Sequence, residues 1–129
     1  MAEQKTAKVV ILGDSDVGKT CILVRYIEGI FNEFQISTIG TNFVTKKITL
    51  NNKKTINIEL WDTAGQERYR AVVQAFYHNV DVCIFVYDIT NKNSFESIQN
   101  YWIPNVKKFN HINASKTFYN IFSFCFGWK

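Results

Sequence analysis

The stretch GDSDVGKT, residues 13–20, follows directly after the apolar run KVVIL. Two glycines stand five positions apart, and a lysine and a threonine follow the second one. Glycine allows backbone angles that other residues avoid, so such a loop can turn several backbone N–H groups toward one point. Apolar residues recur at helical spacing from Ile22 to Ile27. The predicted local order is therefore strand, glycine loop, helix.

This order predicts a loop that binds phosphate. Backbone N–H groups from about Ser15 to Thr20 can surround an anion, and the positive end of the helix that begins at Gly18 adds to the attraction. Lys19 can reach the β and γ phosphates of a nucleotide, and the Thr20 hydroxyl can bind Mg²⁺. The alternative for this motif alone is a glycine turn with an incidental lysine.

A second stretch, INIELWDTAGQ at residues 56–66, supplies what a phosphate loop lacks. Asp62 follows an alternating strand and can hold the magnesium ion with its water shell. Gly65 can offer a backbone N–H to a γ-phosphate, and Gln66 can orient an attacking water. Between the two stretches, Thr38 of STIG can bring a second hydroxyl to the metal. On their own, Asp62 and Thr38 also fit ordinary turn or capping residues.

The remaining pattern predicts the fold. Two β-rich runs flank LNNKK within residues 41–62 and predict an antiparallel hairpin. A short helix, a buried strand and an amphipathic helix are expected at residues 68–79, 80–90 and 93–109. Alternating strands and helices indicate an α/β fold, an open, mostly parallel sheet with helices on both faces.

Two details of the last helix can be predicted. Asn93 or Ser94 is expected to cap its first turn, because both side chains can accept a hydrogen bond from the backbone there. Pro104 lies inside the helical pattern, so we expect a kink or a break at that residue.

Composition narrows the class of protein. The chain has 129 residues, 47% of them hydrophobic and 16% aromatic, which suits one domain with a substantial core. The net charge of +4 is spread along the sequence, which does not indicate a partner among nucleic acids. Cys21, Cys83 and Cys125 are widely spaced in apolar contexts, so we expect reduced core cysteines rather than disulfides or a zinc site. The apolar run before Gly13 is too short for a signal sequence, and a cytoplasmic chain is expected.

Taken in order, GDSDVGKT, STIG and WDTAGQERYR resemble the Ras superfamily of small GTP-binding switch proteins. IGTNF at 39–43, RYRAVVQAFYHNVD at 68–81 and FVYDIT at 85–90 are similar to signature stretches of Rab proteins, the vesicle-traffic branch. The similarity extends from about residue 7 to about residue 109. It implies a P-loop NTPase fold and a GTP/GDP switch that hydrolyses GTP to GDP and phosphate.

The resemblance also implies roles for individual residues. Gln66 would be catalytic, and Thr20, Thr38 and Asp62 would hold Mg²⁺. Phe43, Trp61 and Phe76 match the apolar triad that meets effectors, although from sequence alone these three aromatic residues would be assigned to the core. The residues expected to bind GTP or GDP are Ser15, Asp16, Val17, Gly18, Lys19, Thr20, Cys21, Phe31, Thr38 and Gly65.

The implied partners are those of a switch: exchange factors, GTPase activators and effector proteins. The sequence has no obvious arginine aimed at the phosphates, so slow intrinsic turnover and an arginine supplied by a partner are expected. The C-terminus lacks a C-a-a-X ending, so membrane contact is expected to be indirect, at endomembranes.

The sequence departs from the family pattern in its phosphate loop, at Gln35, where a tyrosine is common, and in the stretch expected to read guanine. Asp16 stands where Rab proteins usually carry a small residue, and its extra carboxylate is expected to impair hydrolysis. Where the family reads guanine with Asn-Lys-x-Asp, this chain has FYNIFSF at 118–124, with Ser123 in place of the aspartate. The sequence therefore shows no residue that would select guanine over other bases.

These departures lead us to expect one incomplete small GTPase domain over residues 1–129, truncated after its fourth or fifth strand, with a divergent apolar tail at 117–129. The tail would pair as a makeshift fifth strand or, the interpretation we favour, represent an alternative terminus read beyond an exon boundary near Lys116. Two other functions stay open: a fragment that only binds proteins, and a P-loop protein that binds nucleotides whatever their base.

Overall fold

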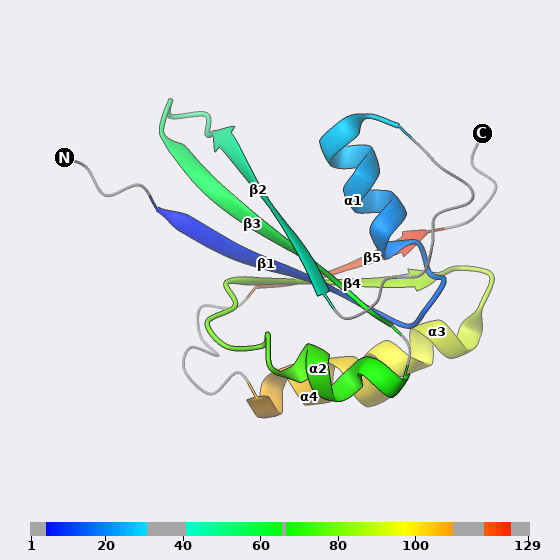
Figure 1. Cartoon of the computed structure of the whole chain (residues 1–129). Coiled ribbons are helices and arrows are strands. Elements are labelled where there is room, and N and C mark those ends of the chain that lie inside the picture. Colours follow the sequence, from blue (N-terminus) through cyan, green and yellow to red (C-terminus); the bar gives the residue numbers. More distant parts are fainter. Residues whose placement is uncertain (1–4, 31–40, 66, 110–117, 125–129) are drawn as a thin grey trace.

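The computed structural model describes residues 5–30, 41–65, 67–109 and 118–124 (Figure 1). A 3-10 turn, Glu67–Tyr69, leads into α2 (Arg70–Gln74), and a π-helical turn, Ile98–Trp102, joins α3 (Lys92–Ser97) to α4 (Ile103–Phe109). The strands are β1 (Thr6–Leu12), β2 (Thr41–Thr49), β3 (Thr55–Thr63), β4 (Val82–Asp88) and β5 (Phe118–Phe124). The helices are α1 (Lys19–Glu28), α2 (Arg70–Gln74), α3 (Lys92–Ser97) and α4 (Ile103–Phe109).

The strands form one sheet in the order β2-β3-β1-β4-β5. β1 runs parallel to both β3 and β4, β4 runs parallel to β5, and β2 pairs antiparallel with β3. The predicted open, mostly parallel α/β sheet and the antiparallel hairpin are both confirmed. In this register Ile11 of β1 lies opposite Asp62 of β3, which places the end of β3 beside the loop after β1.

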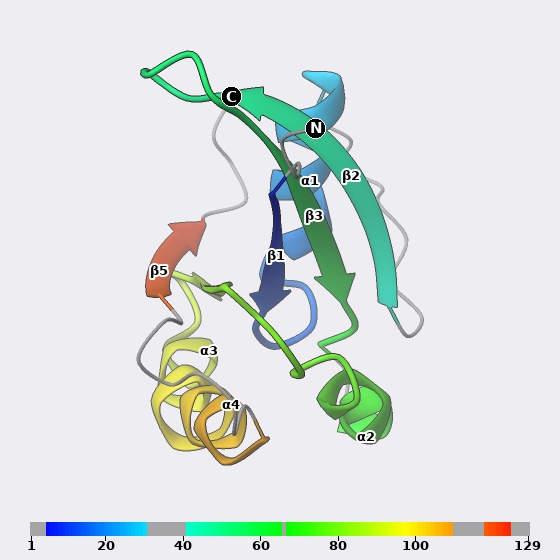
Figure 2. The same ribbon diagram turned by 90° about the vertical axis from the view of Figure 1, so that its left-hand side faces the viewer.

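Helices cover both faces of the sheet. Figures 1 and 2 show α1 on one side and α2, α3 and α4 on the other. Successive residues of β1 point to opposite faces, so Val9 and Ile11 belong to the cluster under α1, while Val10 and Leu12 belong to the cluster under the other helices. An apolar run without alternation, such as KVVIL, is typical of a strand buried on both faces.

The helical stretch after β4 differs from the prediction at its start. Asn91, not Asn93 or Ser94, is the capping residue, and its side chain accepts a hydrogen bond from the Ser94 backbone N–H at 3.4 Å. Ser94 instead turns its hydroxyl inward, where it donates to the Asn91 carbonyl at 2.7 Å and accepts from the Asp88 N–H at 3.0 Å. The prediction was wrong because several adjacent residues can cap, and burial of Ser94 decided among them.

The irregularity expected at Pro104 lies just before it. The Ile103 N–H bonds to the Ile98 carbonyl five residues back, which is the π-helical spacing. Pro104 follows directly, inside one continuous helical stretch from Lys92 to Phe109, and it has no N–H to donate to the preceding turn. The π turn therefore lets the helical stretch continue through the proline.

The C-terminal stretch does form a strand. β5 pairs with β4 over seven registered residue pairs, from Val82 opposite Phe118 to Asp88 opposite Phe124. The expected makeshift fifth strand is confirmed, whereas the alternative-terminus interpretation stays a prediction. Cys21 and Cys83 are buried thiols, as expected, and Cys125 lies outside the described residues. None of the helices that the structure describes has the length and apolar character needed to cross a bilayer.

Candidate phosphate-binding site

The glycine loop connects the end of β1 to the start of α1, as predicted. Gly18 occupies the position before the helix with φ 98°, a left-handed angle that glycine adopts without strain. Asp16 also has a positive φ, 61°, which is uncommon for a residue with a side chain. Val17 is buried and fixes the loop to the core cluster under α1. The loop thus curls around the N-terminus of α1.

Lys19 is the most unusual charged group of the loop. Only 6% of the residue is exposed, and its ammonium donates a hydrogen bond to the Asp14 carbonyl at 2.5 Å. Burial lowers the pKa of Lys19 to about 8, while the nearby carboxylates of Asp62, Asp14 and Asp16 oppose the shift. These carboxylates do not offset the lost hydration of the ammonium, so phosphate oxygens could replace the missing water as hydrogen-bond acceptors.

The predicted metal ligands Thr20 and Asp62 meet at this loop. The Thr20 hydroxyl donates to a carboxylate oxygen of Asp62 at 2.6 Å, across 42 positions of sequence. Mg²⁺ binds oxygen ligands at about 2.0–2.1 Å in an octahedron, so neighbouring ligand atoms lie about 3 Å apart. The two oxygens therefore already have a spacing that suits one magnesium ion. The donor set, a hydroxyl and a carboxylate, fits this hard cation as well.

Gly65 lies against the loop from the side of β3. A Cβ atom at this position would collide with the backbone of Asp14 and Ser15. The absence of a side chain is thus a requirement of the packing. Gly65 and Ser15 line the same cavity, while their predicted backbone contacts to one ligand stay a prediction.

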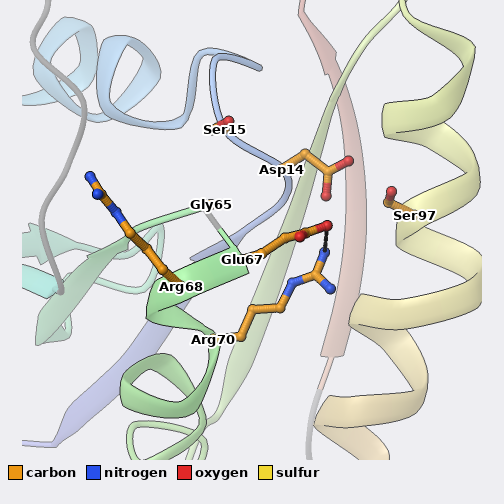
Figure 3. A pocket seen from close by; sticks show the side chains of 7 residues that line it. All are labelled: Asp14, Ser15, Gly65, Glu67, Arg68, Arg70 and Ser97. Atoms are coloured by element: carbon orange, nitrogen blue, oxygen red, sulfur yellow. Dashed lines mark ion pairs between the residues drawn. The ribbon is translucent and has the colours of Figure 1, made fainter.

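A cavity of about 620 Å³ lies beside the loop (Figure 3). The sequence did not predict the charged residues that line it, Glu67, Arg68 and Arg70. Arg70 forms an ion pair with Glu67 at 3.9 Å, and its guanidinium lies 3.7 Å from the centre of the Tyr101 ring. The i,i+3 spacing of Glu67 and Arg70 was the available signal. The lining residues are Asp14, Ser15, Gly65, Glu67, Arg68, Arg70 and Ser97.

The other predicted nucleotide residues divide into two groups. The loop and first turn of α1 bring Ser15, Asp16, Val17, Gly18, Lys19, Thr20 and Cys21 together, and Asp62 and Gly65 join them from β3 and the residues after it. Cys21 is buried, and burial raises the pKa of its thiol. Phe31, Thr38 and Gln66 lie outside the described residues, so their roles stay predictions.

Phe43, Trp61 and Phe76 form one stack across the sheet and the turn that follows α2. The Phe43 and Trp61 rings lie 4.8 Å apart at 20°, and the Trp61 and Phe76 rings lie 5.0 Å apart at 39°. Phe43 is 55% exposed, so this aromatic patch is open to solvent at one end. Sequence alone had assigned all three residues to the core, and for Phe43 that assignment is wrong, since β2 is an edge strand.

A family model, that of the Ras family, matches residues 8–121 of the sequence. The chain belongs to the Ras family. It is 42% identical over 111 residues to the Ypt/Rab-type GTPase YPT7 of Saccharomyces cerevisiae, an alignment that covers 86% of this chain and 53% of the relative. It is 48% identical over 101 residues to the Ras-related protein Rab-8B of Homo sapiens, covering 78% of this chain and 48% of the relative.

A further relative is the Ras-related protein Rab-19 of Xenopus laevis, 42% identical over 106 residues, covering 82% of this chain and 49% of the relative. These relatives agree with the resemblance to Rab proteins. The chain spans about half the length of the curated relatives that it matches.

Proposed function

We propose that this Ras-family chain is a Rab-type switch that binds GTP and GDP, hydrolyses GTP to GDP and phosphate, and acts in intracellular vesicle traffic. One observation carries the proposal. The buried ammonium of Lys19 and the Thr20–Asp62 oxygen pair lie side by side at the N-terminus of α1. A cation and a magnesium-binding pair at a helix N-terminus suit the end of a polyphosphate chain.

The residues of the loop would each act on a different part of the ligand. The Lys19 ammonium would leave the Asp14 carbonyl and bind phosphate oxygens, which stabilises charge as the bond to the γ-phosphate breaks. Backbone N–H groups between Ser15 and Thr20 would hold the β-phosphate. Magnesium, when bound to Thr20 and Asp62, would supply further positive charge at the β and γ oxygens.

Water and the γ-phosphate complete the proposed reaction. Gly65 would donate its backbone N–H to a γ-phosphate oxygen, and Gln66 would orient the water that attacks the phosphorus. Thr38 would give the metal a second hydroxyl. Loss of the γ-phosphate would remove the contacts to Thr38 and Gly65 and release their loops. In switches of this kind, the γ-phosphate orders these loops and its hydrolysis frees them.

The aromatic patch supports a role in protein recognition. Phe43, Trp61 and Phe76 form a stack that joins an edge strand to the turn after α2, so a partner would contact the sheet and the residues after β3 together. Exposed aromatic clusters are typical of binding surfaces. In this role exchange factors, GTPase activators and effectors would be the partners, in the cytoplasm at endomembranes.

Base selectivity is the part of the proposal that most needs a test. Asn120 and Ser123 lie within β5, where the family would carry its guanine-reading residues. Purified chain in Mg²⁺ buffer should be titrated with GTP, and then competed with ATP and with inorganic pyrophosphate. GTP-selective binding and release of phosphate from GTP would support the proposed switch. Equal affinities for GTP and ATP would mean a base-indifferent phosphate binder, and no binding at all would reject the nucleotide function.

A further inference from the structure

Trp102 reaches the phosphate loop from within the core on the other side of the sheet. The residue is fully buried, and its indole Nε1–H donates a hydrogen bond to a carboxylate oxygen of Asp14 at 2.9 Å. The two residues are 88 positions apart in the sequence. An indole N–H can only donate, and a buried donor is destabilising without an acceptor. The bond therefore satisfies Trp102 and fixes Asp14 at the same time.

Both the side chain and the backbone of Asp14 accept hydrogen bonds. Its carboxylate accepts from Trp102, and its backbone carbonyl accepts from the ammonium of Lys19. Figure 3 shows the Asp14 carboxylate directed toward the α3 side of the cavity, away from Gly65. Gly65 packs against the Asp14–Ser15 peptide. The start of the loop is therefore held on one side by the hydrogen bond from Trp102 and on the other by Gly65. The direction of the Asp14 carbonyl, and with it the resting place of Lys19, depends on both.

The helical stretch that carries Trp102 holds the indole in place. The π turn Ile98–Trp102 departs from α-helical spacing where Tyr101 and Trp102 must face the phosphate loop and α2. The Tyr101 ring meets the Trp102 ring edge-on at 4.9 Å and 86°. The Arg70 guanidinium lies 3.7 Å from the centre of the Tyr101 ring and 5.7 Å from that of Trp102. The indole thus has little freedom to turn away from Asp14.

We propose that Trp102 is a positioning residue of the phosphate loop. By holding the Asp14 carboxylate, it sets the loop conformation that presents Lys19 and the backbone N–H groups to phosphate. The role rests on the proposed nucleotide function, since it concerns the same loop. A hydrogen bond to a charged group is worth enough to change an equilibrium constant about ten-fold or more.

The test compares Trp102→Phe with Tyr77→Phe. Trp102→Phe keeps an aromatic ring in the core but removes the N–H. Tyr77→Phe is the matched control, because Tyr77 is fully buried in the same core cluster and its hydroxyl has no hydrogen-bond partner among the residues that the structure describes. We expect Trp102→Phe to weaken MgGTP binding about ten-fold by calorimetry. We expect Tyr77→Phe to bind like the wild type.

Two further measurements separate positioning from general destabilisation. Amide hydrogen exchange of the nucleotide-free chain should rise in residues 14–20 of Trp102→Phe by more than it rises in β1 and β4. In an Asp14→Ala background, Trp102→Phe should have no further effect on residues 14–20, because the acceptor is already gone. Asp14→Ala alone should reproduce the local effect even if Trp102→Phe folds poorly.

The outcomes are distinguishable. Unchanged exchange in residues 14–20 of Trp102→Phe, or an equal effect of that change with and without the Asp14 carboxylate, would overturn the positioning role. If the wild-type chain binds no MgGTP, the proposed function fails, and the exchange comparison still decides the role of Trp102.

Discussion

The Thr20 hydroxyl and the Asp62 carboxylate are joined by a hydrogen bond of 2.6 Å, which ties the first turn of α1 to the end of β3. Parallel pairing of β1 with β3 creates this contact, since Ile11 and Asp62 are registered opposite one another. When the hydroxyl oxygen turns a lone pair toward a cation, its proton must point elsewhere. Metal binding at this pair would therefore replace the hydrogen bond rather than add to it.

We predict that Thr20→Ala removes most of the magnesium dependence of nucleotide affinity. The substitution deletes one of the two oxygens and leaves the carboxylate, so affinity in Mg²⁺ should fall by at least about ten-fold while affinity in EDTA stays close to that of the wild type. Thr20→Ser keeps the hydroxyl and is the control. A wild-type ratio of the affinities in Mg²⁺ and EDTA for Thr20→Ala would exclude Thr20 as a metal ligand.

Asp16 is expected to weaken the site in which it lies. Its φ of 61° is left-handed, and its carboxylate is close enough to affect the Lys19 ammonium. Asp16→Gly should relieve backbone strain of roughly 1 kcal/mol and remove a negative charge beside the phosphates. Nucleotide affinity is expected to rise several-fold, as measured by fluorescence titration.

Asp16→Asn separates the two causes, because asparagine tolerates the same backbone angle but carries no charge. If charge dominates, Asp16→Asn should recover most of the affinity gain of Asp16→Gly. Weaker binding by both variants would show that the carboxylate assists the ligand instead of repelling it.

Much of the fold could be predicted from the sequence because local signals agreed with the sheet. KVVIL, the LNNKK turn and the run of residues 82–88 each became a strand or a hairpin, and GDSDVGKT became the loop before α1. The signals were strong because each joined β-forming or glycine-rich sequence to a clear turn or helix boundary. The cap at Asn91 was not predicted. Ser94 is buried in the folded chain and therefore does not cap the helix, and burial depends on tertiary packing rather than on local sequence.

The site was predicted in part for a similar physical reason. Lys19, Thr20, Asp62 and Gly65 stand in recognisable spacings, and the structure brings them together. Nothing in the spacing of Trp102 indicates a contact with Asp14, because that bond depends on a π turn and on packing across 88 positions of sequence.

The stability that the buried Cys83 thiol contributes should fall at alkaline pH. Burial raises the pKa of this thiol from 9.0 to about 12, so the folded state keeps the proton after the unfolded state has lost it. The thiol's contribution is complete below pH 9 and declines from pH 9 to about 12, at about 1.4 kcal/mol per pH unit in the free energy of unfolding. Burial raises the pKa of Tyr77 in the same direction.

Urea unfolding between pH 8 and 10.5, which brackets the first half of this window, measures the decline. Buried Lys19, whose pKa is lowered to about 8, adds an opposite trend to both chains over this range. Cys83→Ala removes the thiol, so the free energy of unfolding of the variant should rise relative to that of the wild type as the pH increases above 9. An identical slope for the two chains would mean that the Cys83 thiol does not remain protonated in the folded state.

The central claim, that Lys19 is held as a buried cation for phosphate, is tested most directly by Lys19→Met. The substitution replaces a poorly solvated ammonium with an apolar chain of similar length, so two opposite changes are predicted. Affinity for MgGTP should fall at least about a hundred-fold, while the free energy of unfolding of the nucleotide-free chain rises by roughly 2 kcal/mol. Calorimetric titration together with urea unfolding of the same sample measures both. Undiminished MgGTP affinity in a folded Lys19→Met chain would contradict the account.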